Sequence, residues 1–270
     1  MNTKGIALQL DSVTDATLDD LSLLIDLHVD SERQGPGSDA CTKKALQLTG
    51  LNREKPLQIA DLGCGTGASA MVLAEELNAK VLAVDFLQPF LDALNARSSE
   101  RGIGDQIDTI CSSIDDLPFE DQSLDMIWSE GAIYNIGFEN GARAWKRYLK
   151  PGGYLVASEI TWLTRERPAE LTQHWESEYP EIGLASEKFE VLEQLGYIPE
   201  AYFILPEDCW LDHYYKPMQD RFEAYLERNN QSDDARAVVA GEQAEIDLYR
   251  KYKSFFGYGM YVARVPGERR

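Results

Sequence analysis

Short apolar runs and longer helical segments alternate through the middle of the chain. Runs rich in Val, Ile and Leu, typical of buried strands, lie just before Gly63 and at 81–85, 124–130 and 154–158. A helix is predicted at about 68–78, directly after a glycine-rich turn. This alternation indicates a parallel sheet with helices on both faces, so we expect an α/β fold.

Helical periodicity continues on both sides of this central region. Apolar residues recur at helical spacing in 17–30, and a second helix is expected at 39–49 with Ser38 as its N-cap. The part of the chain before the central region is therefore expected to be helical. After the central region, further helices are predicted at 167–179 and 185–195.

The last third of the chain combines two strands with a long connection. Strands are predicted at 197–205 and 254–265, the second rich in aromatic and small residues. Residues 206–253 separate them and are expected to hold helices at 216–228 and 233–252. Insertions of this kind are tolerated in surface connections and often determine specificity.

The turn at 61–67, Asp-Leu-Gly-Cys-Gly-Thr-Gly, is the clearest sign of chemistry in the sequence. Alternate glycines between a strand and a helix allow a ligand to approach the backbone and the helix N-terminus. With Ala68 and the acid Asp85 about twenty residues on, the spacing also fits a dinucleotide site. Asp61 argues against that site, because its carboxylate would repel a pyrophosphate and attract an ammonium or sulfonium.

The turn resembles the first motif of the class I S-adenosylmethionine-dependent methyltransferases. Asp85 at the end of the second strand, the segment 111–119 and the Leu-Lys-Pro-Gly-Gly turn at 149–153 follow in the order of that family. The resemblance implies an α/β fold with a Rossmann-like, seven-stranded, mostly parallel sheet and helices on both faces. It also implies an N-terminal helical lid, and a last strand antiparallel to the sixth, here preceded by a helical insertion.

On this basis we expect a single methyltransferase domain over 1–270. Residues 1–55 form the lid and 56–205 the cofactor-binding core. Residues 206–253 form the helical insertion, and 254–270 the last strand and tail.

The resemblance implies S-adenosyl-L-methionine as the cofactor and assigns residues to it. Asp85 would take the ribose hydroxyls, Phe86 would lie against the adenine, and Arg33 would face the methionine carboxylate. Ser113 and Ile114 depart from the family pattern, which puts a side-chain contact to the adenine amino group in doubt. An interhelical linker with a solvated Arg33 is an equally good interpretation. The expected cofactor-binding residues are Arg33, Gly35, Asp61, Gly63, Cys64, Gly65, Gly67, Asp85, Phe86, Ser113, Ile114 and Glu130.

Methyl transfer needs a general base only when the acceptor must lose a proton. The catalytic candidates at the carboxyl ends of the later strands are Glu130, Tyr134 and Glu159. Alternatives remain, because Glu130 is also placed to cap a helix and Glu159 to form an ordinary salt bridge. The aromatic run 209–215 is either a wall of an acceptor pocket or, as we favour, helix packing or a dimer contact.

Composition narrows the class of partner. The 46 acidic and 26 basic residues give a net charge of −20, which disfavours nucleic acids and anionic membranes as partners. Four scattered cysteines and three histidines show no metal-ligand spacing, so no metal site is expected. No signal peptide or membrane span is evident, and the expected location is cytoplasmic.

The sequence therefore predicts an S-adenosylmethionine-dependent methyltransferase that acts on a small organic molecule by in-line methyl transfer. The alternatives are an NAD-dependent oxidoreductase and a non-catalytic S-adenosylmethionine-binding protein. The identity of the acceptor is left open, as is a homodimer.

Overall fold

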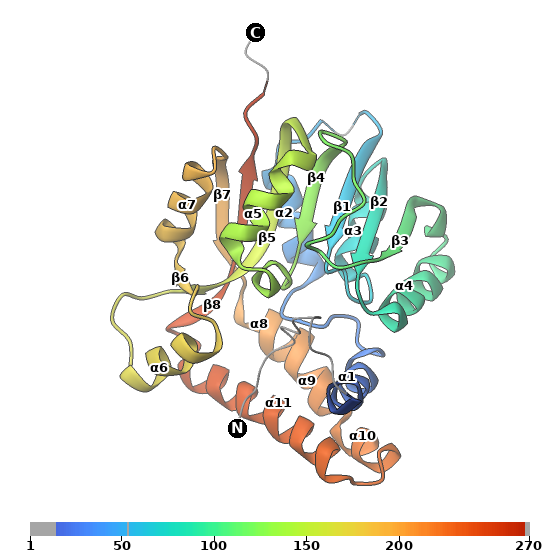
Figure 1. Ribbon diagram of the computed structural model, residues 1–270, viewed down its shortest axis with the longest axis vertical. Helices are drawn as coiled ribbons and strands as arrows, with labels where there is room; N and C mark the ends of the chain where they lie inside the picture. The colour runs from blue at the N-terminus through green and yellow to red at the C-terminus, as the bar shows by residue number, and fades with distance from the viewer. Residues whose placement is uncertain (1–14, 53, 268–270) are drawn as a thin grey trace.

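A mostly parallel sheet forms the centre of the computed structural model, which describes residues 15–52 and 54–267 (Figure 1). Its main strands lie in the order β3-β2-β1-β4-β5-β8-β7. Strand β8 runs antiparallel to both β5 and β7, whereas the other neighbours on this path are parallel. The strands are β1 (Leu57–Leu62), β2 (Ala79–Asp85), β3 (Ile107–Cys111), β4 (Leu124–Ser129), β5 (Leu149–Trp162), β7 (Ile198–Ile204) and β8 (Phe256–Arg264). The predicted fold class is confirmed.

The sheet contains one strand more than the seven expected. Strand β6 (Gly183–Leu184) pairs in parallel with Thr161 and Trp162 at the end of β5. This pairing is possible because β5 continues past Ser158, where the sequence had suggested that it ends. Two residues are too few to leave a periodic signal in the sequence.

The Pro-Gly-Gly segment at 151–153 lies within β5 instead of in a turn before it. Leu149 pairs with Leu124, whereas Tyr154 pairs with Met126, so extra residues of β5 bulge out of the ladder between the two pairs. Gly152 has a φ of +82°, a backbone conformation that favours glycine. The expected turn is therefore an irregularity inside a strand.

Helices cover both faces of the sheet and build two apolar cores. One core joins α2 (Asp39–Leu48), α3 (Ala68–Glu76) and α4 (Gln88–Glu100) to the sheet. The other joins α5 (Phe138–Trp145) and α7 (Ala185–Gln194) to the opposite face. As predicted, Ser38 caps α2, because its hydroxyl accepts a hydrogen bond from the Cys41 amide.

A further layer of helices lies beyond the carboxyl ends of the parallel strands (Figure 1). The helices of this helical layer are α1 (Asp15–His28), α8 (Glu207–Trp210), α9 (Lys216–Gln219), α10 (Phe222–Arg228) and α11 (Asp233–Tyr252), with a π-helical turn at Leu211–Tyr215. The predicted helix at 216–228 is thus divided in two, and the chain is already helical from Glu207. Helix α6 (Ala169–Glu178) follows β5. Among the described residues, no helix is long and apolar enough to cross a membrane.

Part of the aromatic run at 209–215 packs the helical layer against β8. Trp210 is stacked on Tyr249 of α11 with ring centroids 4.2 Å apart, and on Tyr258 of β8 at 5.2 Å. Cys209, Trp210 and Tyr215 are all buried. These three residues therefore serve as packing, the interpretation favoured from the sequence.

Candidate functional site

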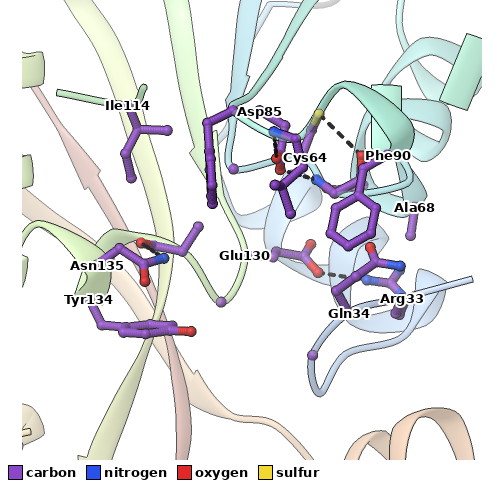
Figure 2. Close-up of a pocket in the computed structure, with 18 of the residues that line it drawn as sticks. Arg33, Gln34, Cys64, Ala68, Asp85, Phe90, Ile114, Glu130, Tyr134 and Asn135 are labelled. Atoms are coloured by element: carbon purple, nitrogen blue, oxygen red, sulfur yellow. Dashed lines mark hydrogen bonds and ion pairs between the residues drawn. The ribbon is translucent and has the colours of Figure 1, made fainter. Parts of the chain in front are cut away.

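A cavity of about 470 Å³ opens at the carboxyl ends of the central strands (Figure 2). This volume is typical of sites that hold small molecules and cofactors. The cavity is formed by five segments from different parts of the fold, namely 33–36, 63–69, 85–90, 113–115 and 130–136. The loop that follows α1 and the carboxyl ends of β1, β2 and β4 thus surround one cavity.

Most of the residues selected from the sequence line this cavity. The lining residues among them are Arg33, Gly35, Gly63, Cys64, Gly65, Asp85, Phe86, Ser113, Ile114, Glu130 and Tyr134. Three other candidates, Asp61, Gly67 and Glu159, do not line it. Residues selected from the sequence therefore occur in every segment of the cavity wall.

The three glycines of the turn are required chiefly by packing against protein. Gly63, Gly65 and Gly67 all have positive φ, at 72°, 55° and 88°. A Cβ atom would lie 2.2 Å from Ala132 Cβ at Gly63, 2.2 Å from Gln34 Oε1 at Gly65 and 2.0 Å from a Leu94 methyl at Gly67. Neighbouring side chains therefore require glycine at these three positions, in addition to any approach of a ligand to the turn.

Asp61 was expected to face the cofactor, but the structure places it behind the turn. It belongs to β1, is fully buried, and accepts a hydrogen bond of 2.6 Å from the Ser69 hydroxyl at the start of α3. Its other oxygen has no hydrogen-bond partner among the described residues. Burial raises the pKa of this carboxyl to about 7. Asp61 thus links strand to helix, and the assignment as a cavity residue is corrected.

Asp85 presents a carboxylate to the cavity at the end of β2. Its Oδ2 accepts a hydrogen bond from the Gly65 amide and its Oδ1 one from the Leu87 amide, both at 2.9 Å. Each oxygen keeps a further lone pair, so the group can still accept two hydrogen bonds from a ligand. The two amides fix the orientation of the carboxylate, which suits it to a pair of adjacent hydroxyl groups.

Apolar side chains flank Asp85. Phe86 is 36% exposed and lines the cavity, as does Ile114 from the segment after β3. The Ile114 carbonyl accepts a hydrogen bond of 2.8 Å from the Trp145 indole of α5, which anchors this segment. The two side chains provide apolar surface for a flat ring next to the Asp85 carboxylate.

An ion pair between Arg33 and Glu130 forms another part of the wall (Figure 2). Arg33 Nη1 donates to Glu130 Oε2 at 2.8 Å. Glu130 Oε1 also accepts hydrogen bonds from the Thr42 hydroxyl at 2.6 Å and the Trp128 indole at 2.9 Å. Because three donors hold this carboxylate, Glu130 is better suited to orienting charge than to removing a proton. Arg33 is consequently no solvated linker residue.

Glu159, a candidate for acceptor chemistry, lies away from the cavity. It is fully buried, and its Oε1 accepts hydrogen bonds of 2.7 Å from both Lys188 and Tyr179. Burial raises the pKa of this carboxyl, although Lys188 opposes the shift. The structure therefore corrects the catalytic assignment in favour of the alternative salt bridge.

Tyr134 and Asn135 lie across the cavity from Arg33 and Gln34 (Figure 2). Burial, together with the charges of Glu245 and Glu159, raises the pKa of Tyr134 to about 12. The Tyr134 hydroxyl therefore stays protonated near neutral pH. It can donate a hydrogen bond to a bound molecule.

The sequence did not predict a role for Gln34, which links the loop that follows α1 to the glycine turn through hydrogen bonds. Its Oε1 accepts a hydrogen bond of 2.9 Å from the Thr66 amide, and its Nε2 donates to the Thr66 hydroxyl and the His28 carbonyl. Its position between Arg33 and Gly35 was the only available signal. The other lining residues outside the predicted set of site residues are Pro36, Ala68, Ser69, Leu87, Phe90, Asp115, Gly131, Ala132, Asn135 and Ile136.

The structural comparison finds proteins of the same fold. A methyltransferase from Geobacter sulfurreducens, solved with S-adenosyl-L-homocysteine, superimposes with a TM-score of 0.79 at 19% identity, covering 90% of this chain and 97% of that one. The cyclase SpnF superimposes with a TM-score of 0.72 at 21% identity, covering 95% and 98%. At these identities the likeness shows a shared fold.

The sequence comparison leads to the same group of proteins. A sarcosine/dimethylglycine N-methyltransferase from Halorhodospira halochloris is 24% identical over 139 residues, 50% of this chain and 50% of that protein. The match thus spans half the length of this relative. Residues 60–157 match the family model described as a methyltransferase domain. Residues 60–157 are thus similar to a methyltransferase domain, and the fold of the chain is that of a solved methyltransferase.

Proposed function

We propose that this protein transfers the methyl group of S-adenosylmethionine to a small organic acceptor. The observation that carries the proposal is a single cavity that joins the Asp85 carboxylate to the Arg33–Glu130 ion pair. These groups match the two polar ends of that cofactor, which has ribose hydroxyls at one end and an amino acid at the other. When bound, the cofactor supplies a methyl group activated by a positively charged sulfur.

The residues of the cavity fit this molecule in chemical type. Asp85 would accept hydrogen bonds from the ribose hydroxyls, with Phe86 and Ile114 against the adenine. Arg33 would bind the carboxylate of the methionine part. Glu130 would stabilise positive charge, because Arg33 holds its carboxyl group in a fixed orientation at the cavity wall.

The chain's own contribution to the reaction would be orientation and the exclusion of water. The loop 33–36 is fastened over the glycine turn by Gln34, which limits access from that side. Tyr134, with its protonated hydroxyl, would orient the acceptor at the opposite wall. Because three donors hold Glu130, this carboxylate would orient charge and would not remove a proton from the acceptor.

Several features favour a small molecule as the acceptor. The charge of −20 opposes binding of nucleic acids, and the relative from Halorhodospira halochloris is named for small amino acid derivatives. A cytoplasmic location and a homodimer stay predictions from the sequence.

A second candidate function is favoured by one finding. SpnF shares the fold and is a cyclase, so this scaffold also supports chemistry other than methyl transfer. A protein that binds S-adenosylmethionine without transferring its methyl group would have the same Asp85 site. The NAD-dependent oxidoreductase is less well supported, because no second basic group stands beside Arg33 among the described lining residues.

Isothermal titration with S-adenosylmethionine, S-adenosylhomocysteine and NADH tests the cofactor assignment. We expect both sulfur compounds to bind at one site per chain and NADH not to compete with them. Binding of NADH together with failure of both sulfur compounds would contradict the proposal. Binding without methyl transfer to any fraction of cell metabolites would favour the second candidate.

A further inference from the structure

Two cysteines from distant parts of the chain meet where α2 contacts the helical layer. Cys41 lies in the first turn of α2, and Cys209 lies in α8. Their sulfur atoms are 3.6 Å apart, although 168 residues separate them in the sequence. Both are free thiols, and of the described cysteines only these two have sulfurs within hydrogen-bonding reach of each other. The fold therefore places two thiols side by side at this junction.

The hydroxyl of Ser38 holds both cysteines in place. Its Oγ accepts a hydrogen bond of 3.2 Å from the Cys41 amide and one of 3.5 Å from the Cys209 thiol. The two sulfurs of a disulfide lie about 2 Å apart, so these sulfurs would have to approach each other by about 1.5 Å to form one. A small movement of α8 against α2 would thus suffice to join them.

Cys41 is the more reactive member of the pair. It retains 5% of its surface exposed, whereas Cys209 has none, so a small oxidant reaches Cys41 first. The first turn of a helix favours a thiolate, which is the nucleophilic form of cysteine. The hydrogen bond with Cys209 lowers the pKa of the Cys41 thiol to about 6 and raises that of Cys209. Cys41 is therefore the attacking sulfur, and Cys209 keeps its proton.

The other two cysteines have different surroundings. The Cys64 thiol in the glycine turn donates to the Gly65 carbonyl, and burial raises its pKa. The Cys111 thiol at the end of β3 is exposed and donates to the Phe86 carbonyl at 3.6 Å. Since each of these two sulfurs contacts a carbonyl and not a second thiol, they serve as internal controls for the Cys41–Cys209 pair.

Cys209 contacts the cavity wall through Gly37. The Cys209 carbonyl accepts a hydrogen bond of 3.4 Å from the Gly37 amide. Gly37 packs directly on the ion pair of the cavity wall, since an added Cβ would lie 2.9 Å from Arg33 Nη1 and 3.2 Å from Glu130 Oε2. A displacement of Cys209 therefore reaches the ion pair through a single residue.

Cys41 contacts the same ion pair through the residue that follows it. Thr42 donates a hydrogen bond of 2.6 Å to Glu130 Oε1, and Glu130 lines the cavity. Because Thr42 is adjacent to Cys41 in α2, a movement of Cys41 towards Cys209 carries Thr42 with it. The distance between the two sulfurs is thus coupled to the orientation of the Glu130 carboxylate.

We propose that Cys41 and Cys209 form a redox-sensitive pair, which a peroxide converts to a disulfide, and that this bond weakens cofactor binding in the neighbouring cavity. The formation of the disulfide is independent of the proposed function, whereas its effect on the cofactor rests on it. The bond ties α8 to α2 and pulls on both residues, Gly37 and Thr42, that contact the ion pair of the cavity wall.

The oxidation proceeds in two steps with hydrogen peroxide as the oxidant. The Cys41 thiolate attacks one peroxide oxygen, so that an S–O bond forms and the O–O bond breaks, and the hydroxide that leaves takes a proton from solvent to become water. The Cys209 sulfur then attacks the sulfenic acid of Cys41, so that the S–S bond forms and the S–O bond breaks. The second hydroxide leaves with the Cys209 proton as water. Two thiols are oxidised to one disulfide, and one peroxide is reduced to two waters.

Mass spectrometry and titration calorimetry on the full chain test the two parts of the proposal. The reduced protein is treated with hydrogen peroxide, the excess is removed with catalase, and the remaining thiols are blocked. We expect a loss of two hydrogen atoms in mass and a cross-linked peptide that contains Cys41 and Cys209, with Cys64 and Cys111 blocked. The disulfide form should bind S-adenosylhomocysteine about tenfold more weakly than the reduced protein, and dithiothreitol should restore the affinity.

Cys209→Ser and Cys41→Ser should each abolish the cross-link and keep the affinity for S-adenosylhomocysteine the same before and after peroxide. Cys111→Ser is the matched control and should still form the disulfide, because Cys111 is an exposed thiol without a sulfur partner. Absence of the Cys41–Cys209 cross-link, an unchanged affinity in the disulfide form, or an equal loss of affinity in Cys209→Ser would overturn the proposal. Failure of S-adenosylhomocysteine to bind the reduced protein would contradict the cofactor assignment, while the cross-link still decides whether the two thiols form a redox pair. Thermal unfolding of each variant shows whether the fold is retained.

Discussion

At the scale of single residues, the site depends on carboxylates that the protein has already oriented. Asp85 is fixed by the amides of Gly65 and Leu87, and Glu130 by Arg33, Thr42 and Trp128. A ligand that meets such groups does not have to order them, so more of the interaction energy contributes to affinity. Both residues could be selected from the sequence, because each follows a predicted strand. The partners that hold these two carboxylates could not be selected from the sequence, since Arg33, for example, lies 97 residues from Glu130.

Asp85→Asn should weaken binding of S-adenosylhomocysteine by about 10- to 100-fold. The amide nitrogen of asparagine cannot accept a hydrogen bond, so one backbone amide or one ribose hydroxyl loses its partner, at a cost of about 1–3 kcal/mol. Titration calorimetry measures the change. Asp92→Asn, an exposed acid on the adjoining helix, serves as the control and should bind normally. An unchanged affinity in Asp85→Asn would show that the ribose lies elsewhere.

Arg33→Gln should destabilise the protein by about 3 kcal/mol, because it leaves the carboxylate of Glu130 without its cation at a site where both side chains are at most 10% exposed. The double variant with Glu130→Gln should recover part of this loss. Urea unfolding of the two single variants and the double variant gives the coupling energy. Lys216→Gln breaks an exposed pair with Asp220 and should change stability by less than about 0.5 kcal/mol. Strictly additive effects of the Arg33 and Glu130 substitutions would argue against the buried pair.

At the scale of elements, some boundaries could be predicted and others could not. Helix α11 was predicted over 233–252 as observed, because Ser232 caps it and acidic and basic residues occupy its first and last turns. The helix around 207–215 was missed because its aromatic side chains are spaced by packing on Tyr249 and Tyr258. Strand β6 depends entirely on pairing with β5. Local signals predict an element well only when its stability is also local.

The glycine turn offers a test at this scale. Gly65→Ala should destabilise the protein by about 2–4 kcal/mol, because it combines a positive φ with a clash against Gln34. Gly102→Ala is the matched control, since Gly102 also has a positive φ but no atom lies within 4 Å of the added Cβ, and it should cost only about 1 kcal/mol. Thermal unfolding compares the two. Equal losses would mean that Gln34 yields without cost.

At the scale of the whole molecule, the site lies at the carboxyl ends of the central strands, the end of the sheet that faces the helical layer. The sequence could predict the fold, because the ordered motifs follow the strands along the chain. It could not predict that Glu159 lies outside the site. That placement follows from tertiary packing between segments far apart in sequence. The acceptor side is therefore the part least accessible to sequence reasoning.

The buried carboxyl of Asp61 should make the stability of the whole molecule depend on pH. Its pKa is about 7 in the folded protein and near 4 in an unfolded chain, so the folded state binds the proton more tightly. The contribution of this group is fully present below about pH 4 and is lost as the pH rises through 7. The free energy of unfolding of Asp61→Asn should consequently exceed that of the original protein by a few kcal/mol at pH 8, and by progressively less towards pH 4. Urea unfolding across this range measures the difference, and a difference that does not vary with pH would contradict the assignment.

Transfer of a labelled methyl group tests the central claim most directly. The protein is incubated with S-adenosylmethionine labelled in its methyl group and with cell extract divided into small molecules, proteins and nucleic acids. We predict that the label enters the small-molecule fraction, that a methylated product can be identified by its mass, and that Asp85→Asn greatly reduces the transfer. Label found only in nucleic acid, or no transfer by a protein that binds S-adenosylmethionine, would contradict the account.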